Sequence, residues 1–201
     1  LKVVDFLERH NYRNGLNLTY EVRDGIINHS GYNISTTLEG QIVKIADRIA
    51  YINHDIDDAV RAEIIKEKDL PNDCINSLGN THSERINTMI LDVINNSLDK
   101  NNILMSKEIG DKTEKLRKFM FDNVYFNSIA KTEDDKAEYI IKELYYYYLN
   151  NVDKLPLEYQ SYEGIDSSIE DRICDYIAGM TDKYVKNLFT NIFLPRGWEK
   201  F

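Results

Sequence analysis

The chain has 201 residues, with 34 acidic and 25 basic side chains and a formal net charge of −9. Such a surface argues against general binding to nucleic acids or anionic membranes, because those partners need a basic field. Nine glycines and three prolines favour long helices over a turn-rich β fold. Cys74 and Cys174 lack the spacing of a metal site, and we interpret them as reduced thiols of a cytoplasmic protein.

The first residues already have a helical pattern. Val3, Val4 and Leu7 are apolar, no capping residue precedes them, and the chain does not begin with methionine. We therefore interpret the chain as a piece of a longer protein. The next helix is predicted to begin after Asn17, which could serve as its N-cap, and to end near His29.

The longest predicted helix covers residues 36–59. Thr36 and Glu39 have the spacing of a capping box, in which each side chain accepts a hydrogen bond from the backbone N–H of the other residue. Apolar residues then recur at steps of four and three, which indicates one face packed against a core. These residues are Leu38, Ile42, Ile45, Ile49, Ile52, Ile56 and Ala59.

A polar row follows another face of this helix. Asp47, Tyr51 and Asp55 lie at i, i+4 and i+8, so their side chains stack along the helix. At roughly 100° per residue, the row lies well over 90° from the centre of the apolar stripe. Solvated surface is the ordinary state of such acidic residues, and periodicity alone does not distinguish a site from a surface.

The rest of the chain is also predicted to be helical. Pro71 ends the long helix region, and Thr81–Glu84 and Ser167–Glu170 have the spacing of capping boxes. A helix after Thr132 carries four consecutive tyrosines, 145–148, which cannot share one face. We interpret them as packing and interface groups, with nucleobase stacking as the alternative. No stretch alternates as a strand does, so the predicted class is all-α.

Three strings in the sequence resemble one enzyme family. They are LNLTYEVRDGIINH (16–29), ADRIAYINHDIDDA (46–59) and DYIAGMTDKY (175–184), and they are similar to the bacterial deoxynucleoside triphosphate triphosphohydrolases, the dGTPase-like branch of the HD-domain phosphohydrolases. The resemblance implies part of a multi-helix HD-domain-like bundle with a C-terminal helical extension. Residues 1–70 would be the last part of the catalytic domain, and residues 71–201 would complete the pocket and could form an oligomer interface.

The resemblance implies one metal ligand in this chain. The family holds a divalent cation with a His, a His-Asp pair and a later Asp, and Asp47 resembles that later Asp; the bound metal would activate a water. His54–Asp55 spells the same two letters, but no glycine- and histidine-rich segment surrounds it. Asp55 also lies about 12 Å along the helix from Asp47, so the two carboxylates cannot bind one ion at about 2 Å.

The resemblance also implies contacts to a nucleotide. Arg48 resembles a basic residue that meets the phosphates, for which a guanidinium is well suited. Tyr51 resembles a tyrosine beside the triphosphate and sugar, and Asp55 resembles the carboxylate that accepts from the sugar 3′-hydroxyl. A surface Arg, a core Tyr and a solvated Asp are the alternatives.

Three weaker candidates lie in or just before the third string, residues 175–184. Arg172 and Asp175 lie three apart on one helical face with Tyr176 beside them, and they could belong to the pocket wall or support it. A structural ion pair is the alternative. His29 could approach the site, but a histidine at a helix C-terminus more commonly satisfies backbone carbonyls.

The family's first His, its His-Asp pair and the acid–base residues after that pair have no counterpart in this sequence. We therefore predict no catalytic residue here, no tight binding of a divalent metal such as Mg²⁺ or Mn²⁺, and no hydrolysis by this chain alone. The intact enzyme would cleave a dNTP to a deoxynucleoside and triphosphate, as a homo-oligomer with a nucleotide effector. A non-catalytic helical regulatory domain, or an HD phosphohydrolase acting on other nucleotides, is the alternative.

Overall fold

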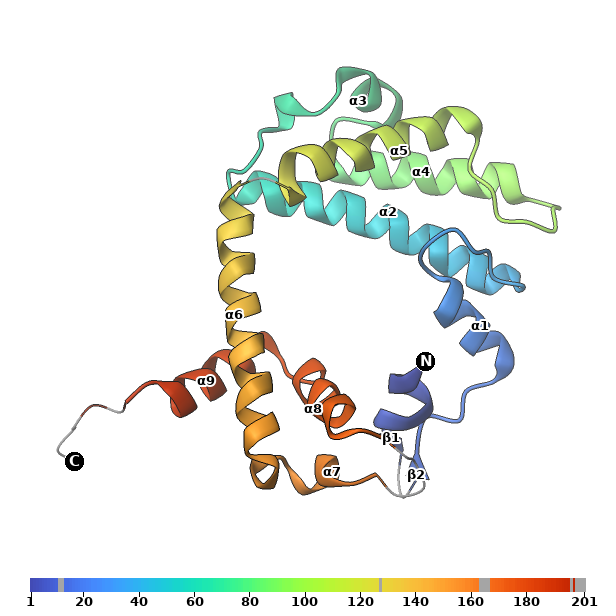
Figure 1. Cartoon of the computed structure of the whole chain (residues 1–201). Coiled ribbons are helices and arrows are strands. Elements are labelled where there is room, and N and C mark those ends of the chain that lie inside the picture. The colour runs from blue at the N-terminus through green and yellow to red at the C-terminus, as the bar shows by residue number, and fades with distance from the viewer. Residues whose placement is uncertain (11–12, 127, 163–166, 196, 198–201) are drawn as a thin grey trace. The chain divides into compact units, whose positions relative to one another are not determined.

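A computed structural model describes residues 1–10, 13–126, 128–162, 167–195 and 197. The all-α prediction is confirmed, because the described residues are mostly helical (Figure 1). The strands among them form one short antiparallel ladder between β1 (Arg9–His10) and β2 (Arg13–Asn14). The chain divides into two compact units, Leu1–Asn127 and Ser128–Phe201.

Helices account for the other elements of both units. The first unit contains η1 (Val3–Leu7), α1 (Tyr20–Asn28), α2 (Leu38–Arg61), η2 (Glu67–Asp69), α3 (Asn72–Leu78), α4 (His82–Ser97), α5 (Lys107–Met120) and η3 (Phe121–Tyr125). The second unit contains α6 (Ser128–Asn150), η4 (Val152–Lys154), α7 (Leu157–Gln160), α8 (Ile169–Ala178) and α9 (Asp182–Phe193).

The compact units do not follow the division into residues 1–70 and 71–201. Helix α2 precedes residue 70 and helices α4 and α5 follow it, yet all three contribute to one hydrophobic core. The assignment of the two ranges to a catalytic domain and an appended helical region stays a prediction.

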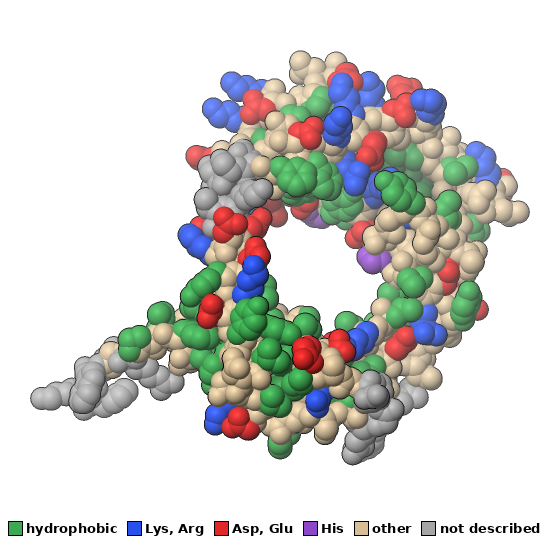
Figure 2. Space-filling view, viewed as in Figure 1, with side chains coloured by type: hydrophobic (Ala, Val, Ile, Leu, Met, Phe, Trp, Pro, Cys, Tyr) green, Lys and Arg blue, Asp and Glu red, His purple; other side chains and the backbone are tan. Residues whose placement is uncertain are grey.

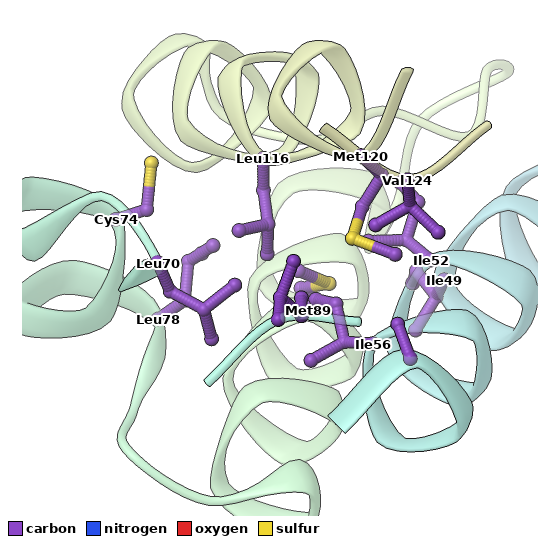
Figure 3. Packing of buried hydrophobic residues seen from close by; sticks show 12 residues of the cluster. Ile49, Ile52, Ile56, Leu70, Cys74, Leu78, Met89, Leu116, Met120 and Val124 are labelled. Carbon is purple, nitrogen blue, oxygen red and sulfur yellow. The ribbon is translucent and has the colours of Figure 1, made fainter. Parts of the chain in front are cut away.

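The core of the first unit is built around the second half of α2. Ile52 and Ile56 are each 1% exposed. Their side chains lie among Met89 of α4 and Leu116 and Met120 of α5 (Figure 3). Burying such side chains fully stabilises a fold by about 1.5–3 kcal/mol each, so this cluster fixes α2 against α4 and α5.

The predicted apolar stripe of α2 is only partly buried. From Ile49 to Ala59 its members lie in the core, whereas Leu38 and Ile42 are 38% and 51% exposed. The early turns instead meet α1 at a crossing of two glycines. A Cβ at Gly40 would lie 3.2 Å from the Cα of Gly25 and would collide with the side chain of Ser35, so only glycine allows this close approach.

Helix α2 begins one residue later than predicted, and its capping box is wrong. Thr37 is the N-cap and accepts from the backbone N–H of Gly40 at 3.2 Å. Thr36 instead donates its backbone N–H and its hydroxyl to Asp24, at 2.7 and 2.9 Å. Hydrogen bonds from Ser35 and Thr36 lower the pKa of Asp24. Asp24 of α1 therefore binds Thr36, the residue that the sequence pattern predicted as the N-cap of α2.

The other two predicted capping boxes have different outcomes. The Thr81–Glu84 box is confirmed at the start of α4. The Ser167–Glu170 box is wrong by one residue, because Ser168 caps α8 and accepts from the backbone N–H of Asp171 at 3.1 Å.

A buried polar group links α2 to α4. Arg85 is 2% exposed, and Asn53 is fully buried. Arg85 donates from Nε to Oδ1 of Asn53 at 2.9 Å and from Nη1 to the carbonyl of Asn80 at 3.2 Å. Its Nη2 lies 3.5 Å from Asp57. These contacts fix the rotation of α2 about its own axis relative to α4.

An exposed ion cluster links α3 to α5. Asp73 accepts from Lys112 and Lys115, each at 2.7 Å. The hydrogen bonds from Lys112 and then Lys115 lower the pKa of Asp73 to about 2.

The second unit has its own core. Leu144 and Ile173 are fully buried between α6 and α8, and Tyr148 and Tyr176 pack edge to face with ring centroids 5.3 Å apart. Hydrophobic side chains gather where these two helices meet (Figure 2). Tyr148 is 3% exposed and Tyr146 is 57% exposed, so the tyrosine run points around α6 as predicted. No helix in the described part of the chain is long and apolar enough to cross a membrane.

Candidate functional site

The polar face of α2 opens onto a cleft of about 540 Å³ in the first unit. Asp47, Arg48 and Tyr51 line it from α2, together with the segment His29–Tyr32 that follows α1. Glu114 and Arg117 of α5 also line it. The structure therefore brings three of the four metal and substrate residues predicted on α2 into one cavity. Whether they bind a metal or a substrate stays a prediction.

The cleft is locally more basic than the chain as a whole. Lys44, Arg48 and Arg117 line it against Asp47 and Glu114, which gives three basic and two acidic side chains in a chain of net charge −9. Lys44 donates to the carbonyls of Gly31 and Asn33 and so holds the wall after α1 in place. Arg48 and Arg117 are the cations available to an anionic ligand.

Arg117 is positioned by three partners, on α2, α5 and η3. Its Nε donates to the hydroxyl of Tyr51 at 3.1 Å, and its Nη1 donates to Glu114 at 2.6 Å. Its guanidinium lies 4.9 Å from the ring centroid of Phe121, within the range of a cation–π contact. The guanidinium is thus held at the edge of the cleft before any ligand binds.

Asp55 lies two turns beyond Asp47 on α2 and is held by η3. The hydroxyl of Tyr125 donates to Oδ2 of Asp55. Burial, followed by this hydrogen bond, raises the pKa of the Tyr125 phenol well above its ordinary value, so the phenol remains a donor at neutral pH. Oδ1 of Asp55 makes no hydrogen bond to any described residue and could accept from a ligand hydroxyl.

Asp47 lies at the border of two hollows. It is exposed, and it makes no hydrogen bond or ion pair with the residues that the structure describes. Besides the polar cleft, it lines a largely apolar groove of about 670 Å³ with Val22, Gly25 and Val43. His29 also lines both hollows, and its Nδ1 lies 2.6 Å from the carbonyl of Ile26. The expected contact with a helix C-terminal carbonyl is therefore present.

The described residues do not make a complete metal site. They contain no group of three or more His, Cys, Asp or Glu side chains arranged to hold an ion. Magnesium and calcium need about six or more ligands, and structural zinc needs four. Asp47 could supply one oxygen, and the other ligands would have to come from outside the described residues.

The three candidates of the last motif lie in the second unit. Arg172 donates to the backbone carbonyls of Gln160 and Ser168. Tyr162 donates to Asp175 at 3.1 Å, and the hydroxyl of Tyr176 lies 3.0 Å from that of Tyr184. The contacts named here are all made within the second unit. A role of Arg172, Asp175 and Tyr176 in the pocket stays a prediction.

The sequence reasoning missed Arg117 and Tyr125. A usable signal was present, because Arg117, Phe121 and Tyr125 repeat the i, i+4, i+8 spacing of Asp47, Tyr51 and Asp55. Two such rows on different helices can face each other, and here Arg117 is hydrogen-bonded to Tyr51 and Tyr125 to Asp55.

Residues 103–191 match the family described as "Phosphohydrolase-associated domain". The chain is 50% identical over 198 residues to a "Deoxyguanosinetriphosphate triphosphohydrolase-like protein" of Caldanaerobacter subterraneus subsp. tengcongensis, covering 98% of this chain and 58% of the relative. Proteins of the same name are similar in Clostridium perfringens strain SM101, at 47% over 194 residues (90% and 56% covered), and in Desulfatibacillum aliphaticivorans, at 38% over 213 residues (97% and 60% covered). The chain thus spans less than two thirds of the length of these relatives.

Proposed function

The chain is a homologue of the deoxyguanosinetriphosphate triphosphohydrolase-like proteins, and on that basis we propose that its cleft binds the triphosphate of a deoxynucleoside triphosphate. The observation that carries this proposal is the meeting of Asp47, Arg48, Tyr51 and Arg117 in one cavity. Two guanidinium groups within an acidic chain form a local site for a polyanion, and their planar donors suit phosphate oxygens.

Each side chain has a role in this proposal. Arg48 and Arg117 contact phosphate oxygens, and Tyr51, which accepts from Arg117, keeps that guanidinium aimed at them. Asp55, which already accepts from Tyr125, accepts from the sugar 3′-hydroxyl with its other oxygen. The positions fit one extended ligand, because Asp47 and Asp55 lie about 12 Å apart along α2.

In a protein as long as its relatives, the reaction would be hydrolysis of a dNTP to a deoxynucleoside and inorganic triphosphate. We propose that Asp47 then supplies one ligand to a divalent cation, with the remaining ligands and the acid–base groups coming from residues beyond those described here. The 201-residue chain alone would bind the nucleotide and would not hydrolyse it.

Calorimetric titration of the 201-residue chain with dGTP in metal-free buffer tests the cleft. Arg117→Ala should weaken binding roughly 10- to 100-fold, because a hydrogen bond to a charged group contributes about 1.5–3 kcal/mol. Lys118→Ala is the matched control, since Lys118 is the next cation on α5 and does not line the cleft. Equal affinities for the two variants would reject the phosphate site.

The reaction is tested in a protein of the relatives' length. Phosphorus NMR of the products of dGTP and Mg²⁺ should show inorganic triphosphate, and Asp47→Ala should abolish its release. Orthophosphate as the product would indicate a different phosphohydrolase. Unchanged triphosphate release by Asp47→Ala would remove Asp47 from the metal site.

A further inference from the structure

Two histidines from different helices lie side by side in the first unit. His54 is on α2, one turn beyond Tyr51, and His82 is the first residue of α4. Their ring centroids are 5.0 Å apart and the rings are tilted by 55°. Neither residue lines the polar cleft or the apolar groove, so the proposed nucleotide site leaves this pair unused.

The two ring nitrogens of His82 have different surroundings. Nδ1 lies 3.6 Å from Oδ2 of Asp57. Nε2 is buried and has no hydrogen-bond partner among the described residues. A buried nitrogen without a partner lowers stability, and binding of a water or an ion is an ordinary way to satisfy it.

This arrangement matches that of a metal-bound histidine. Such a histidine commonly binds the ion through one nitrogen while the other donates to a carboxylate, which fixes the tautomer and the ring orientation. Asp57 lies on the Nδ1 side of His82 at 3.6 Å, which is longer than a hydrogen bond, so a small approach of the ring to Asp57 completes the pattern and leaves Nε2 for the ion. His54 is exposed and its ring lies beside that of His82, so a side-chain rotation could bring one of its nitrogens to the same point.

We propose that His54 and His82 form a two-histidine site for a late first-row divalent cation such as Zn²⁺, with Asp57 orienting His82. Zinc–nitrogen bonds of about 2.0–2.1 Å place two ligating nitrogens within about 4 Å of each other, a separation that rings 5.0 Å apart can reach. Because Nε2 of His82 is shielded from solvent, the exposed His54 ring moves to admit the ion, and water completes the coordination.

The local charges permit an added cation. Asp57 and Asp58 supply two carboxylates on α2, which face Arg85 at 3.5 Å and Arg61 at 3.1 Å. The Asp57–Arg85 and Asp58–Arg61 pairs have no net charge together, so they do not repel a bound cation. An ion at this position would join α2 to α4 and stabilise the first unit in proportion to its occupancy.

The site is tested by titrating Zn²⁺ into the untagged 201-residue chain in a non-chelating buffer at neutral pH. A Cys174→Ser background removes the exposed thiol. We expect one ion per chain, at least tenfold weaker binding in His54→Gln and in His82→Gln, and weakened but retained binding in Asp57→Asn. Zinc should raise the melting temperature of the background chain and leave that of His82→Gln unchanged.

His29→Gln is the matched control and should bind zinc as the background chain does. The proposal is overturned if the chain binds no zinc below millimolar concentration. It is also overturned if His29→Gln or Asp47→Asn abolishes binding while the His54 and His82 variants retain it. If His82→Gln fails to fold, as judged by circular dichroism, the exposed His54 carries the test alone, since replacing it leaves the core intact.

Discussion

Replacing Arg85 with methionine tests how strongly the buried link between α2 and α4 holds the first unit. Methionine keeps most of the apolar volume of the side chain and removes every donor. The variant loses the hydrogen bonds to Asn53 at 2.9 Å and to the carbonyl of Asn80 at 3.2 Å. Each bond from a charged donor contributes about 1.5–3 kcal/mol, and relief of the burial of the charge offsets part of the sum. We expect Arg85→Met to lower the free energy of unfolding by about 2–4 kcal/mol.

The second variant distinguishes this link from ordinary packing. In the Arg85→Met chain, Asn53 keeps a buried acceptor without a donor. Adding Asn53→Leu removes that acceptor, and replacing both partners by apolar groups can be nearly neutral. We therefore expect the double variant to recover to within about 1 kcal/mol of the parent chain.

The assay is urea unfolding followed by circular dichroism, with hydrogen exchange of the α4 amides to assign the transition to the first unit. Lys118→Met, at an exposed position of α5, is the control and should change stability by less than about 0.5 kcal/mol. The reasoning is refuted if Arg85→Met costs less than about 1 kcal/mol, or if the double variant is less stable than the single one.

Three further predictions concern the pH dependence, the helix start and the second unit. Lys112 and Lys115 lower the pKa of Asp73 to about 2, so the ionised carboxylate stabilises the fold above its ordinary pKa of 3.8, and this stabilisation is lost as the pH falls toward 2. The urea midpoint should therefore drop less between pH 5 and pH 2.5 in Asp73→Asn than in the parent. Thr37→Ala should cost about 1 kcal/mol and increase hydrogen exchange in the first turn of α2, and equal exchange there in the parent would refute its role as N-cap. Leu144→Ala, at a fully buried position, should cost about 2–5 kcal/mol and raise exchange in α6 and α8, while equal loss of protection in α4 would contradict separate cores.

The sequence predicted the helical class and the polar row of α2 for a physical reason. Helix periodicity is local, so Asp47 and Tyr51 could be placed on one face without knowing the fold. The exact N-cap was missed because Asp24, twelve residues before Thr36, competes for its donors. A tertiary hydrogen bond of this kind leaves no mark in a local pattern.

The partners of the polar row could not be predicted in the same way. Arg117 meets Tyr51 across a separation of 66 residues, and Tyr125 meets Asp55 across 70. Periodicity shows which side chains share a face and not which helices lie opposite each other. The exposure of Leu38 and Ile42 has the same origin, because an apolar stripe does not reveal how far the neighbouring helices extend along it.

The close contact of α1 with α2 at Gly25 and Gly40 depends on the lack of a side chain at Gly40. A single methyl group on Gly40 would collide with the side chain of Ser35 and, at 3.2 Å from the Cα of Gly25, would also press slightly on α1. Gly40 lines the apolar groove together with Gly25 and His29, so substitution there should change the width of that groove without replacing any charged or aromatic lining group. Mutagenesis restricted to charged and aromatic side chains would therefore overlook Gly40, although the width of the groove depends on it.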